Sequence, residues 1–492
     1  MTETAKKKRG MPSSFTILLA LLAIVAVITV IVSGTSGGAV TAARLSDFCT
    51  APIKGFADAL PVCLFVMILG GFLGMMTETG ALDNGIAVLV QKLKGNEIML
   101  IPVLMLIFSL GGTTYGMCEE TVPFYALLAA TMMAAGFDPM VGAATVLLGA
   151  GCGCLGSTVN PFAVGAAVDA LTGVDIAVNQ SIIIGLGAVL WIVTTAMSIV
   201  FVMNYAKKVK ADKGSTILSM QELKAAEEAH GKAASEVHKE VKLTGRQKGV
   251  LIAFAFTFVV MIVGFIPLAD LNEGVANFFD AGAVYDADGN AVVQGWSALI
   301  TGLPIGQWYF DEASTWFFLM AILIGIIGGL SEKQIVNTFI TGAADMMSVV
   351  LVIALARGIS VLMANTGLDV YVLDAAANAL AGLSGVIFAP MSFLVYFGLS
   401  FLIPSTSGMA TVSMPIMGPL AVKLGFSPEV MVMIFSAAIG VVNLFTPTSG
   451  AIMGGLALAK IEWTTWLKFA LKLIVALSVV CAIILTVACV LI

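Results

Sequence analysis

The sequence predicts an all-α polytopic membrane protein made of two inverted repeats, with about nine transmembrane helices and two re-entrant hairpins. Hydrophobic residues make up 59% of the 492 residues and charged residues 11%, where soluble domains carry about 25% charged residues. Apolar runs of about 18 or more residues recur along the chain, and each can cross a hydrocarbon core of roughly 30 Å.

Short motifs recur in the same order in the two halves of the chain. "IKGFADALPV" (53–62) resembles "ITGAADMMSV" (340–349), and "TYGMCEETVP" (114–123) resembles "TSGMATVSMP" (406–415). "STVNPF" (157–162) corresponds to "LFTPTS" (444–449). The nearly constant offset indicates an internal duplication.

The distribution of basic residues orients the chain. With the N-terminal "AKKKR" and the later "AKKVKADK" in the cytoplasm, all of the 24 Lys and Arg residues lie on that side except Arg44, Lys54, Arg357 and Lys423. This places the N-terminus in the cytoplasm and the C-terminus outside. The first repeat then begins with an outward helix at about 14–33, whereas its counterpart at 314–331 starts outside. The repeats are therefore expected to be inverted, as in secondary transporters that hold substrate near the midplane.

This count divides the chain into four parts. Residues 1–205 form the first repeat and 313–492 the second, separated by a solvated cytoplasmic linker (206–246) and by a linking helix with an external loop (247–312). Each repeat contains a re-entrant hairpin and then a helix that is broken within the membrane. The hairpins are expected at 98–136 and 385–424, and the broken helices at 140–172 and 429–460.

Unwound backbone is expected at two hairpin tips and two helix breaks. "GGTTYG" (111–116) and "PSTSG" (404–408) mark the tips, and "GSTVNPF" (156–162) and "NLFTPTSG" (443–450) mark the breaks, because proline removes a backbone donor and glycine permits unusual dihedrals. Non-helical backbone at membrane depth persists only where it is buried or lines a polar cavity. The four stretches are therefore predicted to converge on one site.

These stretches supply neutral oxygen donors that suit Na⁺ or a polar solute. The candidate residues are Thr113, Thr114, Ser157, Thr158 and Asn160 from the first half and Ser405, Thr406, Ser407, Asn443, Thr446, Thr448 and Ser449 from the second. Sodium sites are expected near Thr114, Ser157 and Asn160 and near Thr406, Asn443 and Thr446. The alternative is that these side chains only satisfy backbone groups freed by proline and glycine.

Two adjacent acids and one base carry the charge in this apolar setting. Glu119 and Glu120 follow the first tip, and Arg357 is the one basic residue deep in a crossing helix. The helix dipole stabilises a negative charge near a helix N-terminus by about 0.3–1 kcal/mol, whereas burying one charge at the bilayer centre costs at least about 2.5 kcal/mol. A proton, a metal ion, an arginine or a cationic substrate must therefore supply the rest. Arg357 is expected either to pair with a glutamate or to bind a substrate carboxylate. An acidic site with neutral donors suits a zwitterion or cation better than a dianion.

The stretch "GGTTYGMCEETVPFYALL…GAGCGCLGSTVNPFAVGAA", together with "PSTSGMATVSMPIMGPLA", resembles the YfcC family of proposed basic amino acid antiporters. That family is grouped with the DcuC-type C4-dicarboxylate carriers of the ion transporter superfamily, and the resemblance covers essentially the whole chain. It implies an inner-membrane homodimer, elevator-like movement of the hairpins, and exchange or Na⁺- or H⁺-coupled transport of arginine/ornithine-type amino acids. The tips here lack the Asn found at the hairpin tips of the superfamily, which argues against the usual contacts with dicarboxylates.

Other functions are compared with this prediction. A carrier of C4-dicarboxylates or other organic anions is the alternative, with Arg357 then binding the anion. An enzyme is not expected, because the sequence shows no nucleophile–base pattern, no membrane histidine pair and no nucleotide-binding loop. No cofactor other than a coupling ion and no nucleic-acid partner is expected, and counterflow of labelled substrate would exclude a passive channel.

Overall fold

The computed structural model describes residues 14–82, 84–85, 88, 96–236, 242–266, 268–271, 273–286, 291–403 and 405–492. These residues are almost entirely helical. Among them, nine helices are long and apolar enough to cross a membrane. The predicted all-α polytopic membrane protein is therefore confirmed. The basic N-terminal stretch of residues 1–13 lies outside the described residues.

The first half of the chain begins with three helices and continues into a helical hairpin. The helices are α1 (Ser14–Ser33), α2 (Leu45–Asp58), α3 (Leu60–Glu78), η1 (Glu97–Met99), α5 (Leu100–Tyr115), η2 (Glu119–Thr121), α6 (Val122–Ala134), α7 (Pro139–Leu155), η3 (Pro161–Gly165), α8 (Ala166–Thr172) and α9 (Gln180–Ala211). Asn160 caps η3, since its side-chain oxygen accepts from the N–H groups of Phe162 and Ala163.

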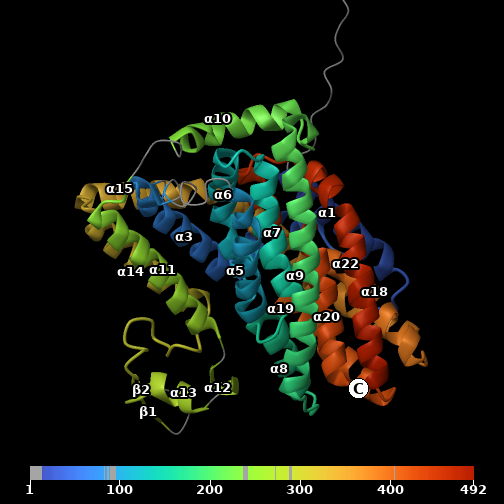
Figure 1. The fold of residues 1–492 in the computed structure, drawn as a ribbon. Helices are drawn as coiled ribbons and strands as arrows, with labels where there is room; N and C mark the ends of the chain where they lie inside the picture. The colour runs from blue at the N-terminus through green and yellow to red at the C-terminus, as the bar shows by residue number, and fades with distance from the viewer. Residues whose placement is uncertain are drawn as a thin grey trace, which may run out of the picture.

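The segment between the halves contains both polar stretches. Its elements are η4 (Lys213–Ser215), α10 (Met220–Glu236), α11 (Gly245–Phe265), α12 (Leu268–Leu271), α13 (Glu273–Phe279), β1 (Val284–Tyr285) and β2 (Ala291–Val293), and the two strands pair antiparallel. Figure 1 shows α10 across one end of the bundle and α12, α13 and the strands at the other end, where the C-terminus also lies.

The second half repeats the order of short helix, long helix, hairpin and broken helix. Its elements are α14 (Phe310–Gly328), α15 (Glu332–Asp345), α16 (Met347–Thr366), α17 (Leu368–Leu380), α18 (Gly385–Leu402), α19 (Thr406–Lys423), α20 (Pro428–Val442), α21 (Gly450–Leu458) and α22 (Trp463–Leu491). The stretches 156–160 and 443–449 are not α-helical.

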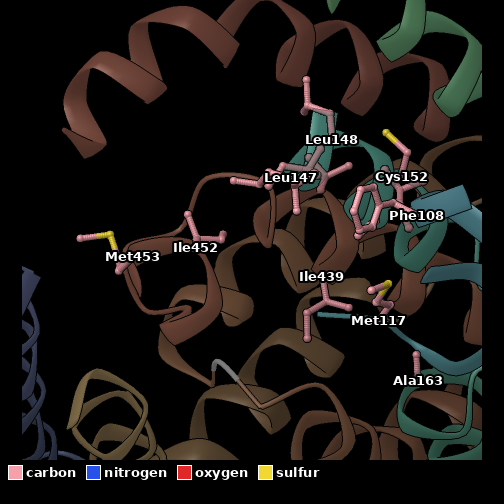
Figure 2. Packing of buried hydrophobic residues seen from close by; sticks show 14 of the residues in the cluster. Phe108, Met117, Leu147, Leu148, Cys152, Ala163, Ile439, Ile452 and Met453 are labelled. Atoms are coloured by element: carbon pink, nitrogen blue, oxygen red, sulfur yellow. The ribbon is translucent and has the colours of Figure 1, made fainter. Parts of the chain in front are cut away.

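The helices form two groups. We call α2, α3, α11 and α14–α16 the frame and α5–α9 with α18–α22 the hairpin bundle. In Figure 1, α3, α11, α14 and α15 stand on one flank, while α7, α9, α20 and α22 stand together on the other. The core of the hairpin bundle is apolar: Figure 2 shows Phe108 of α5, Leu147 of α7, and Ile439 and Ile452 of α20 and α21, which all belong to one cluster of hydrophobic residues.

Both outer ends of the first hairpin lie beside the C-terminal end of α9. Glu97 Oε2 lies 2.7 Å from Lys210 Nζ, and the hydroxyl of Tyr205 donates to Asp138 at the start of α7. The turn of the hairpin lies beside the N-terminal half of α9. The N–H of Thr158 donates to the Thr113 carbonyl at 2.9 Å, and a Cβ added to Gly156 would overlap with Trp191 of α9. Residues 97–138 therefore enter and leave at one end of the bundle and turn within it.

The frame contains two close crossings between glycines of the two halves. A Cβ added to Gly55 would overlap with Gly358, and one added to Gly342 would overlap with Gly70. In the repeat alignment, Gly55 of "IKGFADALPV" corresponds to Gly342 of "ITGAADMMSV". At each of these two equivalent glycines, its own helix crosses a long helix of the other half: α2 crosses α16 at Gly55, and α15 crosses α3 at Gly342.

The broken helices run in opposite senses relative to α10. Thr216, shortly before α10, donates to Asp138 at the start of α7 at 2.7 Å. At the other broken helix, it is the end that contacts α10: His230 Nε2 lies 3.1 Å from the Leu458 carbonyl, and the N–H of Glu462 donates to Glu222 at 2.9 Å. The start of the first broken helix and the end of the second therefore lie at the same end of the molecule.

The expectation that 206–246 is a solvated linker is wrong for one face of α10. Glu222 and His230 are 4% and 8% exposed, and Ala226 between them is fully buried. These residues lie on one helical face and dock on the hairpin bundle. Burial, and to a smaller extent the nearby Lys460, lowers the pKa of His230 below its usual 6.5.

We expect α10 to undock as the pH falls. Because the pKa of docked His230 is lowered, the undocked imidazole takes up a proton first below about pH 6.5, and protonation then favours release of the helix. The test compares the rates at which a maleimide reacts with a cysteine introduced at buried Ala226 and with one introduced at exposed Glu227. The ratio of the first rate to the second should be several-fold higher at pH 5.5 than at pH 7.5. His230→Gln should remove this dependence, and an unchanged ratio in the wild-type background would contradict the docking account.

Candidate functional site

A cavity of about 430 Å³ lies between the frame and the hairpin bundle. Ligand pockets typically measure about 300–1,000 Å³, so the cavity is large enough for a small molecule. Its wall includes the first hairpin turn (116–121), the start of η3 (160–163), the second hairpin turn (405–407) and the second break (448–452). The frame contributes the α2–α3 junction, the start of α14 and the middle of α16.

Glu119 and Glu120 lie in the short helix η2 between the two arms of the first hairpin. Gly116 ends α5 with a left-handed φ of 78°, which glycine adopts readily, and η2 leads into α6. Glu120 is 1% exposed, and its Oε2 accepts from the backbone N–H of Cys118 at 3.0 Å. Glu119 is partly buried. Both side chains line the cavity.

Arg357 also lines the cavity, but its partner is not a glutamate. Its Nε lies 2.9 Å from Oδ2 of Asp58, at the C-terminal end of α2. Of the two alternatives for Arg357, an ion pair with Glu119 or Glu120 does not occur in the structure, and binding of a substrate carboxylate stays a prediction. Asp58 satisfies the arginine because the glycine crossing of Gly55 and Gly358 holds α2 directly against α16. Arg357 is the one lysine or arginine among the described lining residues.

The predicted first tip lies one turn too early in the sequence. Thr113 and Thr114 are still part of α5 and do not line the cavity, because the helix continues to Tyr115. Thr114 Oγ1 donates to the Leu110 carbonyl at 2.6 Å, a bond within its own helix. Thr113 Oγ1 donates to the Gly156 carbonyl at 2.6 Å and so joins the hairpin to the helix break.

The polar side chains of the first break form hydrogen bonds within the protein. Ser157 Oγ donates to the Cys154 carbonyl at 2.6 Å, and Thr158 Oγ1 donates to the Thr113 carbonyl at 3.0 Å. Asn160 Nδ2 donates to Ser157 Oγ at 2.9 Å. Of these three residues, Asn160 lines the cavity. The oxygens of Thr114, Ser157 and Asn160 thus all have hydrogen-bond partners within the protein.

The second half contributes more residues to the wall. Thr406 begins α19 and Ser405 caps it, its Oγ accepting from the Gly408 N–H at 3.2 Å, so Thr406 and Ser407 already belong to the second arm of this hairpin. Thr446 is buried behind the wall and lies 2.7 Å from Thr448, oxygen to oxygen. Besides Arg357, the lining residues of this half among the candidates are Ser405, Thr406, Ser407, Asn443, Thr448 and Ser449.

Several lining residues were not predicted from the sequence. Asp58 and Ser360 come from the frame, and the Ser360 hydroxyl has no hydrogen-bond partner among the described residues. An aromatic group spans the two parts: Phe162 of η3 stacks on Phe310 of α14 at 5.4 Å between ring centroids, and meets Tyr309 edge-on at 6.0 Å. Asp58 lies within the repeat motif at 53–62, which is a sequence signal that could have found it.

No group of three or more His, Cys, Asp or Glu side chains that could hold a metal ion occurs within the described ranges. Thr406 and Asn443 line the cavity, whereas the hydroxyls of Ser157 and Thr446 form hydrogen bonds with other protein groups. The expected sodium sites stay predictions.

A multi-span helical bundle with a cavity that carries charged and polar side chains between two groups of helices is the arrangement of a membrane transporter, and comparison with known proteins agrees. The sequence profile of DcuC, the C4-dicarboxylate anaerobic carrier, matches residues 42–490. The chain therefore belongs to the DcuC family and is a secondary transporter of the YfcC/DcuC type, which acts on small molecules within a lipid bilayer.

Two relatives cover most of the chain. An uncharacterised protein of Haemophilus influenzae is 29% identical over 443 residues, which is 90% of this chain and 78% of the relative. A protein of Escherichia coli, YfcC, named for a proposed activity as a basic amino acid antiporter, is 28% identical over 424 residues, or 84% of this chain and 74% of the relative. The resemblance to the YfcC family is thus confirmed.

Two solved structures also align over nearly the whole chain. MtrF of Neisseria gonorrhoeae, described among antimetabolite efflux pumps, has a TM-score of 0.45 at 17% identity, covering 98% of this chain and 96% of its own. The YdaH transporter of Alcanivorax borkumensis has a TM-score of 0.47 at 15% identity, with coverages of 96% and 97%.

Proposed function

We propose that this carrier exchanges basic amino acids of the arginine/ornithine type across the cell's inner membrane. The observation that carries the proposal is the charge of the cavity. Glu119 and Glu120 line it, while Arg357 is already paired with Asp58 at 2.9 Å. A dianion would meet two carboxylates and no unpaired lysine or arginine among the described lining residues, whereas a cationic side chain would neutralise the glutamates.

A second part of the wall suits the carboxylate of an amino acid. The N-termini of α19 and α21 reach the cavity at Thr406 and Gly450, and helix N-termini favour anions. The hydroxyls of Ser407 and Ser449 stand beside them. In this arrangement the α-carboxylate lies at the helix N-termini and the cationic end of the side chain lies at Glu119.

The inverted repeats and the elevator-like movement belong to the same proposal. The reciprocal glycine crossings Gly55–Gly358 and Gly342–Gly70 support a two-fold relation between the halves. The opposite senses of the broken helices relative to α10 support its inversion. The cytoplasmic N-terminus, the external C-terminus and the re-entrant course of the hairpins follow from the distribution of lysine and arginine. The homodimer and the Na⁺ or H⁺ coupling rest on the family resemblance.

A binding screen tests the substrate class. Arginine and ornithine should raise the melting temperature of the purified protein, because a ligand at 100 times its dissociation constant stabilises the folded state by about 2.7 kcal/mol. Succinate and fumarate should leave the temperature unchanged, with and without Na⁺. Stabilisation by the dicarboxylates alone would overturn the proposal.

One observation favours a second candidate, a C4-dicarboxylate carrier. The family that matches residues 42–490 is named for that substrate. For a dianion to bind, Arg357 would have to leave Asp58, and Glu119 and Glu120 would have to be neutral. Asp58→Asn should then improve dicarboxylate binding, whereas the basic amino acid proposal predicts no dicarboxylate binding in either protein.

A further inference from the structure

We propose that Glu120 is the site of the coupling proton, and that a cationic substrate and this proton replace each other in the cavity. The inference rests on the proposed function, since it takes the substrate to be a cation. It assigns separate tasks to two adjacent carboxylates. Glu119 meets the cationic group of the substrate, and Glu120 holds a proton whenever that group is absent.

The first argument is the balance of charge around the turn. Two ion pairs occur among the described residues, Lys210–Glu97 and Arg357–Asp58, and neither includes Glu119 or Glu120. Two neighbouring carboxylates cannot both stay ionised in an apolar setting without a cation, because each disfavours the charge of the other. In the cavity without substrate, one of the two must therefore carry a proton.

The second argument decides which of the two carries it. Glu120 is 1% exposed and Glu119 is partly buried, so Glu120 loses more hydration when it is charged. Its carboxylate accepts from two backbone N–H groups, that of Cys118 at 3.0 Å and its own, whereas a buried carboxylate has about four acceptor positions. Thr121 Oγ1, beside it, donates to the Cys118 carbonyl and not to the carboxylate.

The helices in contact with the turn present no lysine or arginine to it, while the charge of Arg357 on the nearby α16, which is paired with Asp58, reaches Glu119. The titratable groups there are Tyr115 on α5, Tyr125 on α6, Cys154 on α7 and Cys63 on α3, with Cys118 in the turn itself. The adjoining α21 (Gly450–Leu458) has none. Beyond Glu119, the charged lining residues are Asp58, Arg357 and Asp169. The described neighbours thus supply no free cation that would keep Glu120 ionised.

The exchange step balances in charge and in atoms. When a monocationic group binds beside Glu119, the Glu120 O–H bond breaks and its proton passes to water on the side to which the cavity is open. When the substrate leaves, Glu120 takes a proton from water on the side that then faces the cavity. One cation moves in one direction for each proton in the other. Two cationic amino acids can also replace each other with no proton moved.

Liposomes test the proposal with labelled arginine and the purified full-length chain. With the membrane potential clamped, an acidic lumen should raise arginine uptake several-fold over equal pH, and a Na⁺ gradient should not. In Glu120→Gln, arginine–ornithine exchange should persist at a reduced rate while the response to the pH gradient is lost. Glu78→Gln, at an exposed position at the far end of α3, should behave like wild type.

A second measurement needs no transport. Arginine binding to the purified protein at pH 7, followed by calorimetry in buffers of different ionisation enthalpy, should release about one proton per site. Glu120→Gln should release none. Exchange that ignores the pH gradient, or a Glu120→Gln protein that still follows it, would overturn the proton site and leave the proposed function standing. If arginine neither binds nor exchanges, the proposed function itself fails.

Discussion

Replacing Glu119 with glutamine lowers arginine uptake by at least about 30-fold, because loss of one partner from a buried charge pair costs about 2–5 kcal/mol. Glu119 lines the cavity, is partly buried and takes part in neither ion pair of the described residues, so its charge is available to a substrate. The effect should appear in binding as well as in uptake, since the cation is held in both. Isothermal titration of arginine and initial uptake rates in liposomes measure the two effects.

Glu78→Gln is the matched control for this substitution. Glu78 lies on the frame at the exposed end of α3, away from the lining residues Pro61 and Val62 at the other end. This substitution also removes one negative charge, but at a position that does not line the cavity. Arginine uptake by Glu119→Gln at the rate of the Glu78→Gln control would contradict the assignment of Glu119 to the cation.

Replacing Gly112 with valine destabilises the protein by about 3 kcal/mol or more, because the first hairpin packs on α7 through backbone contact. A Cβ on Gly112 would overlap with the Ala150 carbonyl oxygen, and one on Gly153 of α7 would overlap with the Ser109 carbonyl oxygen. Backbone atoms cannot rotate away, so the helices would have to separate. The hairpin turn with Glu119 and Glu120 would then lose its place in the cavity.

Thermal unfolding in detergent measures this effect, with Gly185→Ala as the control. Gly185 is in α9, and a Cβ there meets no atom within 4 Å, so alanine should leave stability unchanged or slightly raised. An unchanged melting temperature for Gly112→Val would show that the hairpin does not pack on α7 as described.

The sequence predicted the helical fold well because its signals are local. Apolar runs mark the long helices, and Pro161 and Gly450 stand where η3 and α21 begin after the breaks. The docking face of α10 could also have been predicted from the sequence, since Leu223, Ala226 and His230 recur at helical spacing. The prevalence of charged residues in this segment led to its prediction as a solvated linker.

The parts of the site that were missed depend on contacts between distant segments. Arg357 and Asp58 lie in different halves, and their pairing follows from the crossing of α2 and α16 at Gly55 and Gly358. The aromatic contact of Phe162 with Tyr309 and Phe310 likewise joins the two groups of helices. At the first hairpin, Thr114 bonds back to Leu110, so the helix extends further than its hydroxyl-rich sequence suggested.

Counterflow in liposomes tests the central claim, that this cavity carries a basic amino acid by alternating exposure. Vesicles loaded with unlabelled ornithine and placed in a trace of labelled arginine should show a transient overshoot of label that saturates with arginine concentration. Vesicles loaded with succinate should show none. An overshoot of labelled succinate in succinate-loaded vesicles, with no response to arginine or ornithine, would contradict the account.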